Sequence, residues 1–234
     1  MIRLIALLLL TLGMTAISGC SDSTGPGGAD TLDDYWIEGY YCYYPPEVRE
    51  LTWRSCVVYV RSGGASGEAV PGLSVTCNGQ LLSFAQPSYS ADIAGIEPGE
   101  DVTFELSDGR SSITLTLEVP GSPTDLALVE GEWDFSPPAG THTLTWSNPG
   151  SVADSMLVAV GGAQGHHPFS VYAYSVQLPA EATQVTLSNA DMIDFSGADV
   201  VSCSISQGVR GVFAGHSGGS EMWARAAVVG DWTR

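Results

Sequence analysis

The sequence predicts an all-β protein with two antiparallel β-sandwich domains in tandem, preceded by a cleaved leader and a flexible tether. Three observations carry this prediction. Helical periodicity is nearly absent, and short runs of alternating or β-branched residues recur along the chain. Glycine, proline, asparagine and aspartate separate these runs. Short strands divided at regular intervals by turn residues are typical of a β-sandwich or a barrel.

The chain begins with a three-part export signal. Arg3 and the amino terminus form a short positive region, residues 4–12 are almost entirely leucine, isoleucine and alanine, and mostly small residues lead to Cys20. The apolar stretch is shorter than the roughly 20 residues that a membrane-spanning helix needs. Residues 1–19 are therefore predicted to be a secretory signal that is removed.

The end of this leader resembles a bacterial lipobox. Residues 17–20 read Ile-Ser-Gly-Cys, an apolar residue and two small ones before a cysteine. The resemblance implies a lipoprotein in which Cys20 becomes the first residue and carries diacylglycerol and an N-acyl chain such as palmitate. Several acyl chains give stable anchoring. The alternative is an ordinary cleaved signal with a chance cysteine.

Ser21 stands directly after the cysteine, where no aspartate is present. This resembles the pattern that is sorted to the outer membrane, so we expect a lipid-anchored protein of the cell envelope that faces the periplasm or the cell surface. Residues 20–34 are mainly glycine, serine and aspartate. Such a segment has almost nothing to bury and is predicted to be a flexible acidic tether.

The composition excludes one class of partner. The formal net charge of the 234 residues is −18, and loss of Arg3 with the leader makes it −19. All eight basic residues are arginines. This charge argues against nucleic acid, whose binding needs cationic contacts to phosphate. It also repels anionic membrane surfaces, so the lipid on Cys20 must provide the anchoring. Solubility, or a salty or cation-rich habitat, explains the charge.

The first domain is predicted over residues 35–120. It opens with an aromatic run, and later strands are expected in the regions listed here: 51–61, 73–77, 80–84, 102–106 and 113–119. Asn78-Gly79 is a hairpin-type turn. The pattern of strand and turn residues at 69–82 and 98–109 resembles that of bacterial immunoglobulin-like and carboxypeptidase-regulatory-like sandwich modules.

Residues 120–123 read Pro-Gly-Ser-Pro and mark the expected domain boundary. The second domain is predicted over residues 121–234, with strands expected at 142–146, 154–160, 171–178, 183–187, 201–205 and 222–229. A strand that carries Trp146, followed by an Asn-Pro turn and a hydrophobic strand, resembles a fibronectin type III-like module. The long glycine- and histidine-containing insertion at residues 161–170 departs from that pattern.

Four cysteines remain besides the one in the lipobox: Cys42, Cys56, Cys77 and Cys203. Export permits disulfides, and four cysteines allow three complete pairings. We expect Cys42 and Cys56 to bridge, because they flank Pro45-Pro46 in the first hairpin. Cys77 competes for either partner, because its alternation places it on an inward face like Cys56. Cys203 shares an inward face with Val201 and Ile205 and is expected to be a buried, unreactive thiol.

The strongest catalytic motif is the G-x-S-x-G pattern around Ser217. A nucleophile elbow needs an acid and a histidine downstream, and no histidine follows Ser217. The same residues resemble the Gly-Asp-Ser-Gly-Gly of chymotrypsin-like proteases, with His216 in place of the aspartate. His142, Asp194 and Ser217 fit that family's order, but the family's residues around the histidine are missing. A glycine-rich loop explains the motif, and no catalysis is expected. A hydrolase that uses Ser217 is the less favoured alternative.

No metal or cofactor is predicted. His166 and His167 are adjacent on an extended chain and point in opposite directions. The two acidic clusters, residues 191–199 and 97–101, lack EF-hand spacing, so calcium binding stays open.

The densest aromatic cluster lies at the start of the first domain. Its candidate ligand-binding members are Tyr35, Trp36, Tyr40, Tyr41 and Tyr43. These rings either stack across strands or form a surface for a sugar or a partner, and stacking is the preferred interpretation. The sequence as a whole predicts a lipid-anchored envelope protein that acts in binding, adhesion or assembly. A glycan- or small-ligand-binding module that uses these aromatics is the alternative, and the partner is another envelope protein or a glycan.

Overall fold

A computed structural model provides the three-dimensional structure of the chain. It describes residues 31–45, 55–129, 141–150, 153–163, 171–188, 191, 200–216 and 220–233. Apart from one short 3-10 helix, η1 (Leu32–Asp34), the regular elements within these residues are strands. No helix among the described residues is long and apolar enough to cross a membrane. The prediction of an all-β sandwich protein is confirmed.

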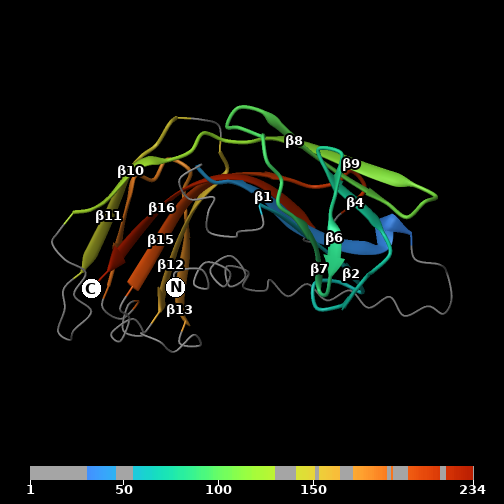
Figure 1. The fold of residues 1–234 in the computed structure, drawn as a ribbon, viewed down its shortest axis with the longest axis horizontal. Helices are drawn as coiled ribbons and strands as arrows, with labels where there is room; N and C mark the ends of the chain where they lie inside the picture. Colours follow the sequence, from blue (N-terminus) through green and yellow to red (C-terminus); the bar gives the residue numbers. More distant parts are fainter. Residues whose placement is uncertain are drawn as a thin grey trace.

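The largest sheet, here called the main sheet, has the order β13-β12-β15-β16-β1-β2-β7-β6, and β3 pairs with β2. Its strands are β1 (Tyr35–Tyr43), β2 (Cys56–Ser62), β3 (Glu68–Ala69), β6 (Ser83–Ala85), β7 (Ser88–Ala91), β12 (Ser155–Ala163), β13 (Val171–Leu178), β15 (Val200–Gly211) and β16 (Glu221–Thr233). In Figure 1, β1 and β16 run side by side as curved bands through the middle of the molecule.

Two smaller sheets complete the molecule. The first cover sheet has the order β5-β4-β8-β9 and consists of β4 (Ser74–Cys77), β5 (Gln80–Leu81), β8 (Asp101–Ser107) and β9 (Ser112–Glu118). The second cover sheet has the order β10-β11-β14 and consists of β10 (Thr124–Leu128), β11 (His142–Ser147) and β14 (Gln184–Leu187). Figure 1 shows them over opposite ends of the main sheet.

Both cores lie on the same face of the main sheet. Side chains alternate along a strand, so every second residue faces one side. On β16, Met222, Ala224 and Ala226 belong to the first core, which the first cover sheet closes. Val228, two residues further along, packs against the second core with Leu144 of β11. The two sandwiches therefore share one continuous sheet.

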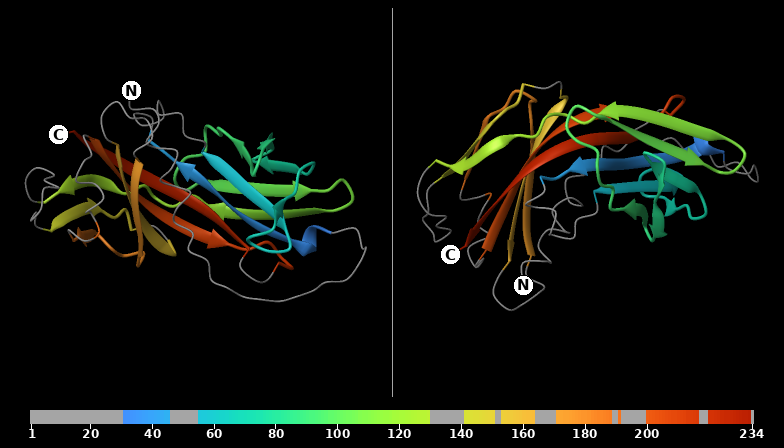
Figure 2. Two further views of the ribbon diagram at one scale, coloured as in Figure 1. Left: turned by 90° about the horizontal axis from the view of Figure 1, so that it is seen from below. Right: turned by 45° about the horizontal axis from the view of Figure 1, so that its top comes forward.

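The last two strands take part in both sandwiches. On β15, Val201, Cys203 and Ile205 belong to the second core, whereas Val209 packs against the first. Figure 2 shows β15 and β16, in orange and red, crossing from one sandwich to the other. A division of the chain into domains at residues 35–120 and 121–234 is therefore wrong in one respect. The C-terminal strands complete the first core as well as the second.

The first and last strands are neighbours in the main sheet. β1 pairs in parallel with β16, with Tyr40 opposite Trp223 and Cys42 opposite Arg225. The hydrogen-bond groups of β1 are thereby paired on both sides, since β2 lies antiparallel on its other side. Pairing on both edges removes an exposed edge that would invite aggregation.

The end of the predicted tether is ordered. Thr31 and Asp34 form a capping box around η1, and Leu32 is only 1% exposed. The prediction of a flexible tether over residues 20–34 is wrong for residues 31–34, because Leu32 supplies the apolar group that the rest of this segment lacks. Residues 20–30 lie outside the described residues.

Several local predictions are confirmed. Asn78 and Gly79 both have positive φ, 46° and 76°, as the hairpin turn between β4 and β5 requires. His142, Leu144 and Trp146 face inward from β11. Pro120-Gly121-Ser122-Pro123 lies between β9 and β10, where the chain passes from the first cover sheet to the second.

Candidate binding surface

The face of the main sheet that points away from both cores carries an unusual set of side chains, and we call it the outer face. On β1 and β16, residues of the outer face alternate with core residues. Its aromatic and charged members on these and the neighbouring strands include Trp36, Glu38, Tyr40, Tyr59, Arg61, Arg210, Glu221, Trp223 and Arg225. They come from β1, β2, β15 and β16.

The strand register arranges these residues in rows. Trp36 lies opposite Arg61. The next row contains Tyr59, Glu38 and Glu221. The third contains Tyr40, Trp223 and Arg210. Directly opposite residues have Cβ atoms about 5 Å apart, so the side chains within a row contact one another.

Two arginines of the outer face lie against aromatic rings. The Cζ atom of Arg225 is 4.4 Å from the ring centroid of Trp223. The Cζ atom of Arg61 is 5.7 Å from the centroid of Trp36 and 5.6 Å from that of Tyr59. Each such contact contributes about 0.5–1 kcal/mol at an exposed site and more where water is excluded. The contacts hold the guanidinium groups against the rings.

Gly208 on β15 makes room for the Trp223–Arg225 pair. A Cβ atom at Gly208 would lie 2.9 Å from the Trp223 ring and 3.2 Å from Nη1 of Arg225. Both side chains therefore pack on bare backbone, and any larger residue at this position must displace them.

The two stacked arginines keep donors that no neighbour uses. Nη1 of Arg225 and Nε of Arg61 are enclosed, and neither has a hydrogen-bond partner within the described part of the chain. Nη1 of Arg61 does donate a 2.8 Å hydrogen bond to the carbonyl oxygen of Ala65. An enclosed donor without a partner carries its full desolvation penalty.

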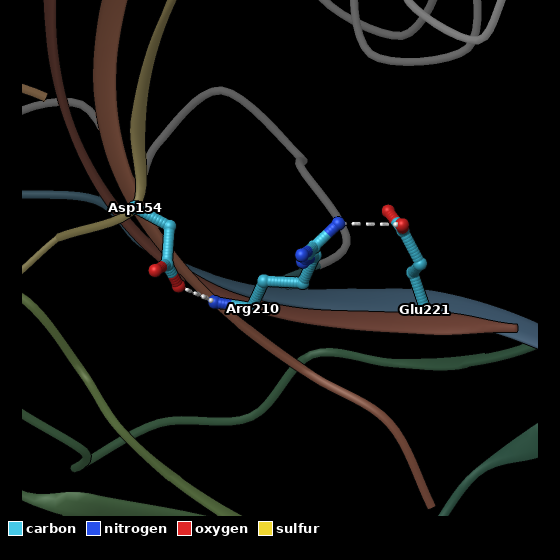
Figure 3. Close-up of polar contacts among 3 residues, drawn as sticks. All are labelled: Asp154, Arg210 and Glu221. Carbon is cyan, nitrogen blue, oxygen red and sulfur yellow. Dashed lines mark hydrogen bonds and ion pairs between the residues drawn. The ribbon is translucent and has the colours of Figure 1, made fainter. Parts of the chain in front are cut away.

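Arg210, the third arginine of the outer face, is already paired. Its Nη1 lies 3.0 Å from Oε1 of Glu221, and its backbone N–H donates to Oδ2 of Asp154 across 2.6 Å (Figure 3). The ion pair is well exposed, with 54% and 34% of the two side chains accessible. Such a pair contributes at most about 1 kcal/mol, so its role is to fix the Arg210 side chain beside the face.

The pKa of the Glu38 carboxyl group lies near neutral pH. Burial raises the pKa of Glu38 from 4.5 to about 7, the charge of Arg61 lowers it, and the charge of Glu221 raises it further. Burial also raises the pKa of Tyr59 and lowers that of Arg225, whose guanidinium stays charged at any physiological pH. The outer face therefore becomes more positive as the pH falls through about 7.

The structure divides the five predicted aromatic ligand residues between two faces. Trp36 and Tyr40 lie on the outer face, whereas Tyr35, Tyr41 and Tyr43 pack with the first core. Tyr41 is 1% exposed, and its hydroxyl donates a 2.8 Å hydrogen bond to the carbonyl oxygen of Ile96. The alternative of a single surface that presents all five rings does not fit this arrangement, because side chains alternate along β1.

Sequence reasoning missed most of the outer face. Tyr59, Arg61, Trp223 and Arg225 join Trp36 only through the pairing of β1 with β2 and β16. The alternation of residues 57, 59 and 61 was visible in the sequence. The parallel pairing of the first and last strands was not.

The cysteines also separate by face. Cys42 lies in a small cluster on the outer face with Tyr44 and Ala227, whereas Cys56 lies in the first core. The expected Cys42–Cys56 bridge is therefore wrong, because β1 and β2 direct the two thiols to opposite sides of the sheet. Cys203 is fully buried in the second core, as expected. Cys20 lies outside the described residues.

The residues of the catalytic motif that the structure describes have a packing role. His216 is 8% exposed, and its Nε2–H donates a 2.7 Å hydrogen bond to the carbonyl oxygen of Leu32. Its ring also lies edge-on to Phe213. Ser217 and Asp194 lie outside the described residues, as do His166 and His167.

The described residues contain no group of three histidine, cysteine, aspartate or glutamate side chains that could hold a metal ion. In the first acidic cluster, the Glu100 carboxylate accepts a 2.8 Å hydrogen bond from the Glu97 backbone N–H and closes a turn. In the second, the Asp191 carboxylate accepts hydrogen bonds from the backbone and hydroxyl of Ser188. Asp199 lies outside the described residues.

Comparison with known proteins adds only distant similarity. No protein-family model matches the chain, and no curated protein matches its sequence. Among solved structures, a segment of two fibronectin type III domains from chicken tenascin is 15% identical, with a TM-score of 0.31, covering 76% of this chain and 91% of that one. The FN1–FN3 domains of chicken CNTN1 are 9% identical, with a TM-score of 0.28, covering 85% of this chain and 66% of that one. Scores this low carry no argument about function.

Proposed function

We propose that the protein is a lipid-anchored, non-catalytic binding protein of the cell envelope, and that the outer face of its main sheet binds an acidic glycan. The anchor rests on the lipobox resemblance at Cys20. The binding function rests on one observation. In a chain with a net charge of −18, the stacked pairs Arg61–Trp36 and Arg225–Trp223 lie on the same sheet face.

The chemistry of the face favours an acidic sugar over a neutral one. Aromatic rings present flat apolar surfaces to the C–H faces of sugar rings, and guanidinium forks pair with carboxylates. The guanidinium groups of Arg61 and Arg225 lie against rings of this face, and a ligand carboxylate would pair with those of their nitrogens that are not enclosed. The strongly acidic remainder of the molecule repels anions and confines an anionic ligand to this face.

The face also suits a chain rather than a single sugar. Its aromatic residues lie on neighbouring strands, which are about 4.8 Å apart, and occupy successive rows along them. Trp36, Tyr40 and Tyr59 are partly exposed and could contact consecutive sugar units, whereas Trp223 is only 9% exposed and holds Arg225. No step in this proposal involves bond cleavage, and Ser217 has no role in it.

Calorimetric titration of the mature lipidated chain in detergent micelles tests the glycan part. We expect a polyuronate to bind, and its neutral counterpart of equal length to bind at least tenfold more weakly. Arg225→Gln should weaken polyuronate binding about tenfold, because one charge-assisted contact is lost. Arg110→Gln, in the β8–β9 turn, is the matched control and should leave binding unchanged.

Equal binding of both polymers, or unchanged binding by Arg225→Gln, would rule out the outer face as the acidic-glycan site. The anchor has its own measurement. Mass spectrometry of the mature amino terminus should show a diacylglyceryl, N-acylated Cys20, and an unmodified terminus at any other residue would refute lipidation.

A further inference from the structure

Two buried cysteines lie on opposite layers of the first sandwich. Cys56 is the first residue of β2 in the main sheet, where it lies opposite Tyr41 and Ala91. Cys77 is the last residue of β4 in the first cover sheet, opposite Phe104. Both are 0% exposed and belong to the same core.

The two side chains enter the same core from facing sheets. Both cysteines are free thiols in this structure, and both belong to the core cluster that the main sheet and the first cover sheet enclose. Burial, and after it the contact with Cys77, raises the pKa of Cys56 well above its usual value. Both side chains are 0% exposed, so a dissolved oxidant has no access to them in the folded protein, and any oxidation must precede closure of the core.

The other two cysteines have no access to this pair. Cys42 points to the outer face of the main sheet, where its pairing partner is Arg225. Cys203 lies in the second core. Among the described cysteines, Cys56 and Cys77 are therefore the pair that shares one core.

We propose that Cys56 and Cys77 are joined by a disulfide in the exported protein, linking the main sheet to the first cover sheet. The proposal rests on the export proposed above. The two thiols give up two protons and two electrons, and a thiol–disulfide oxidant of the exported compartment is reduced from a disulfide to two thiols. The new S–S bond forms while the core is still open to the oxidant.

The cross-link has a defined structural consequence. β2 and β4 belong to different sheets, so side-chain packing alone joins them at this point. A disulfide closing a loop of this length lowers the equilibrium constant for unfolding on the order of a hundredfold. Reductant should therefore destabilise the first sandwich.

Peptide mapping can identify the disulfide without ambiguity in this chain. It has no lysine, and cleavage after Arg49, Arg54, Arg61, Arg110 and Arg210 places each of the four cysteines in a different tryptic peptide. Protein from the envelope fraction is denatured with a thiol alkylator and digested without reduction. We expect peptide 55–61 linked to peptide 62–110, with Cys42 and Cys203 alkylated. Reduction should separate the two peptides.

A second arm makes the result independent of export. Fully reduced full-length chain is refolded in oxidised and reduced glutathione and mapped in the same way, and the same linked pair is expected. If envelope protein with a lipidated Cys20 shows alkylated Cys56 and Cys77, the disulfide proposal is wrong. The proposal that the protein is exported would remain supported. If the leader is found uncleaved, the proposal of export is wrong. The refolding experiment in glutathione then tests the disulfide, and absence of the linked peptide pair would overturn it.

Variants supply the functional readout. Melting of the wild-type protein should fall by several degrees on addition of reductant, and Cys203→Ala should keep that sensitivity. Cys56→Ala/Cys77→Ala should lose it. The proposal would be overturned if reductant leaves the melting temperature of the wild-type protein unchanged. A mapped disulfide to Cys42 or Cys203 would also overturn it. Both results can be obtained even if the double variant does not fold.

Discussion

The ring of His216 is hydrogen-bonded to the backbone of Leu32, with 2.7 Å between Nε2 and the carbonyl oxygen. This contact joins the turn after β15 to the short helix that precedes β1. The backbone N–H of Ile37 adds a second link by donating to Oγ of Ser220 across 3.0 Å. The segment before β16 is therefore tied to the start of the described chain, and the histidine of the Gly-x-Ser-x-Gly motif is accounted for by this role.

Removal of either partner should destabilise the fold. His216→Ala should cost about 1–2 kcal/mol through the lost hydrogen bond and the backbone oxygen that it leaves unpaired. Leu32→Ala should cost about 2 kcal/mol, because a fully buried side chain is truncated. Urea unfolding measures both, and the double variant should cost less than the sum. Val212→Ala, at an exposed position in the same turn, should change stability by less than about 0.5 kcal/mol. If the losses of stability in the two single variants add up to that of the double variant, the interaction between His216 and Leu32 is contradicted.

Glu38 gives a pH dependence with a definite sign. Its pKa is raised from 4.5 to about 7, so the folded state favours the protonated carboxyl. Its contribution to stability is complete below about pH 4.5 and is lost as the pH rises through about 7. Glu38→Gln should therefore stabilise the protein at about pH 8, by about 1–2 kcal/mol once solvent screening is allowed for, and leave it unchanged at about pH 4.5. Thermal melts at both pH values test this, and a pH-independent difference would contradict it.

Gly208 should be intolerant of a side chain. Gly208→Ala places a methyl group 2.9 Å from the Trp223 ring, so the ring and Arg225 must move. We expect a loss of about 1–3 kcal/mol in stability. Binding of the polyuronate should also weaken. Ser204→Ala, on the same strand, is the control and should change stability by less than about 0.5 kcal/mol. Normal stability with normal binding would show that the Trp223–Arg225 packing is not needed.

Cys203 should behave as an inert thiol. It is fully buried, and burial raises its pKa far above the usual value, so almost no thiolate exists at neutral pH. Native protein should resist alkylation at Cys203 and react only after unfolding. Cys203→Ala should cost on the order of 1 kcal/mol through lost packing. Mass spectrometry of labelled tryptic peptides gives the rate, and rapid labelling in the native state would refute the prediction.

Local signals in the sequence predicted local structure well. Alternation located the strands that contain Val102, Leu117 and Leu144, and Asn78-Gly79 marked its hairpin, because period-two burial and positive φ are properties of neighbouring residues. The outer face depends instead on which strands are neighbours. Nothing near Tyr40 and Cys42 indicates that Trp223 and Arg225 lie beside them, because that proximity comes from pairing across nearly the whole chain. The alternative of a five-aromatic surface could have been narrowed from the sequence, because the alternation found in residues 57–61 also applies to Tyr40 and Tyr41.

The parallel pairing of β1 with β16 has a consequence for synthesis. A ribosome releases β1 long before β16, which begins at Glu221 near the end of the sequence. Until then β1 has one unsatisfied edge, and the first core lacks Met222, Ala224 and Ala226. Contacts this distant in sequence form slowly, and an open edge in the meantime invites pairing with other chains. We therefore expect the unfinished protein to need protection by a holding chaperone until β16 is available to pair with β1.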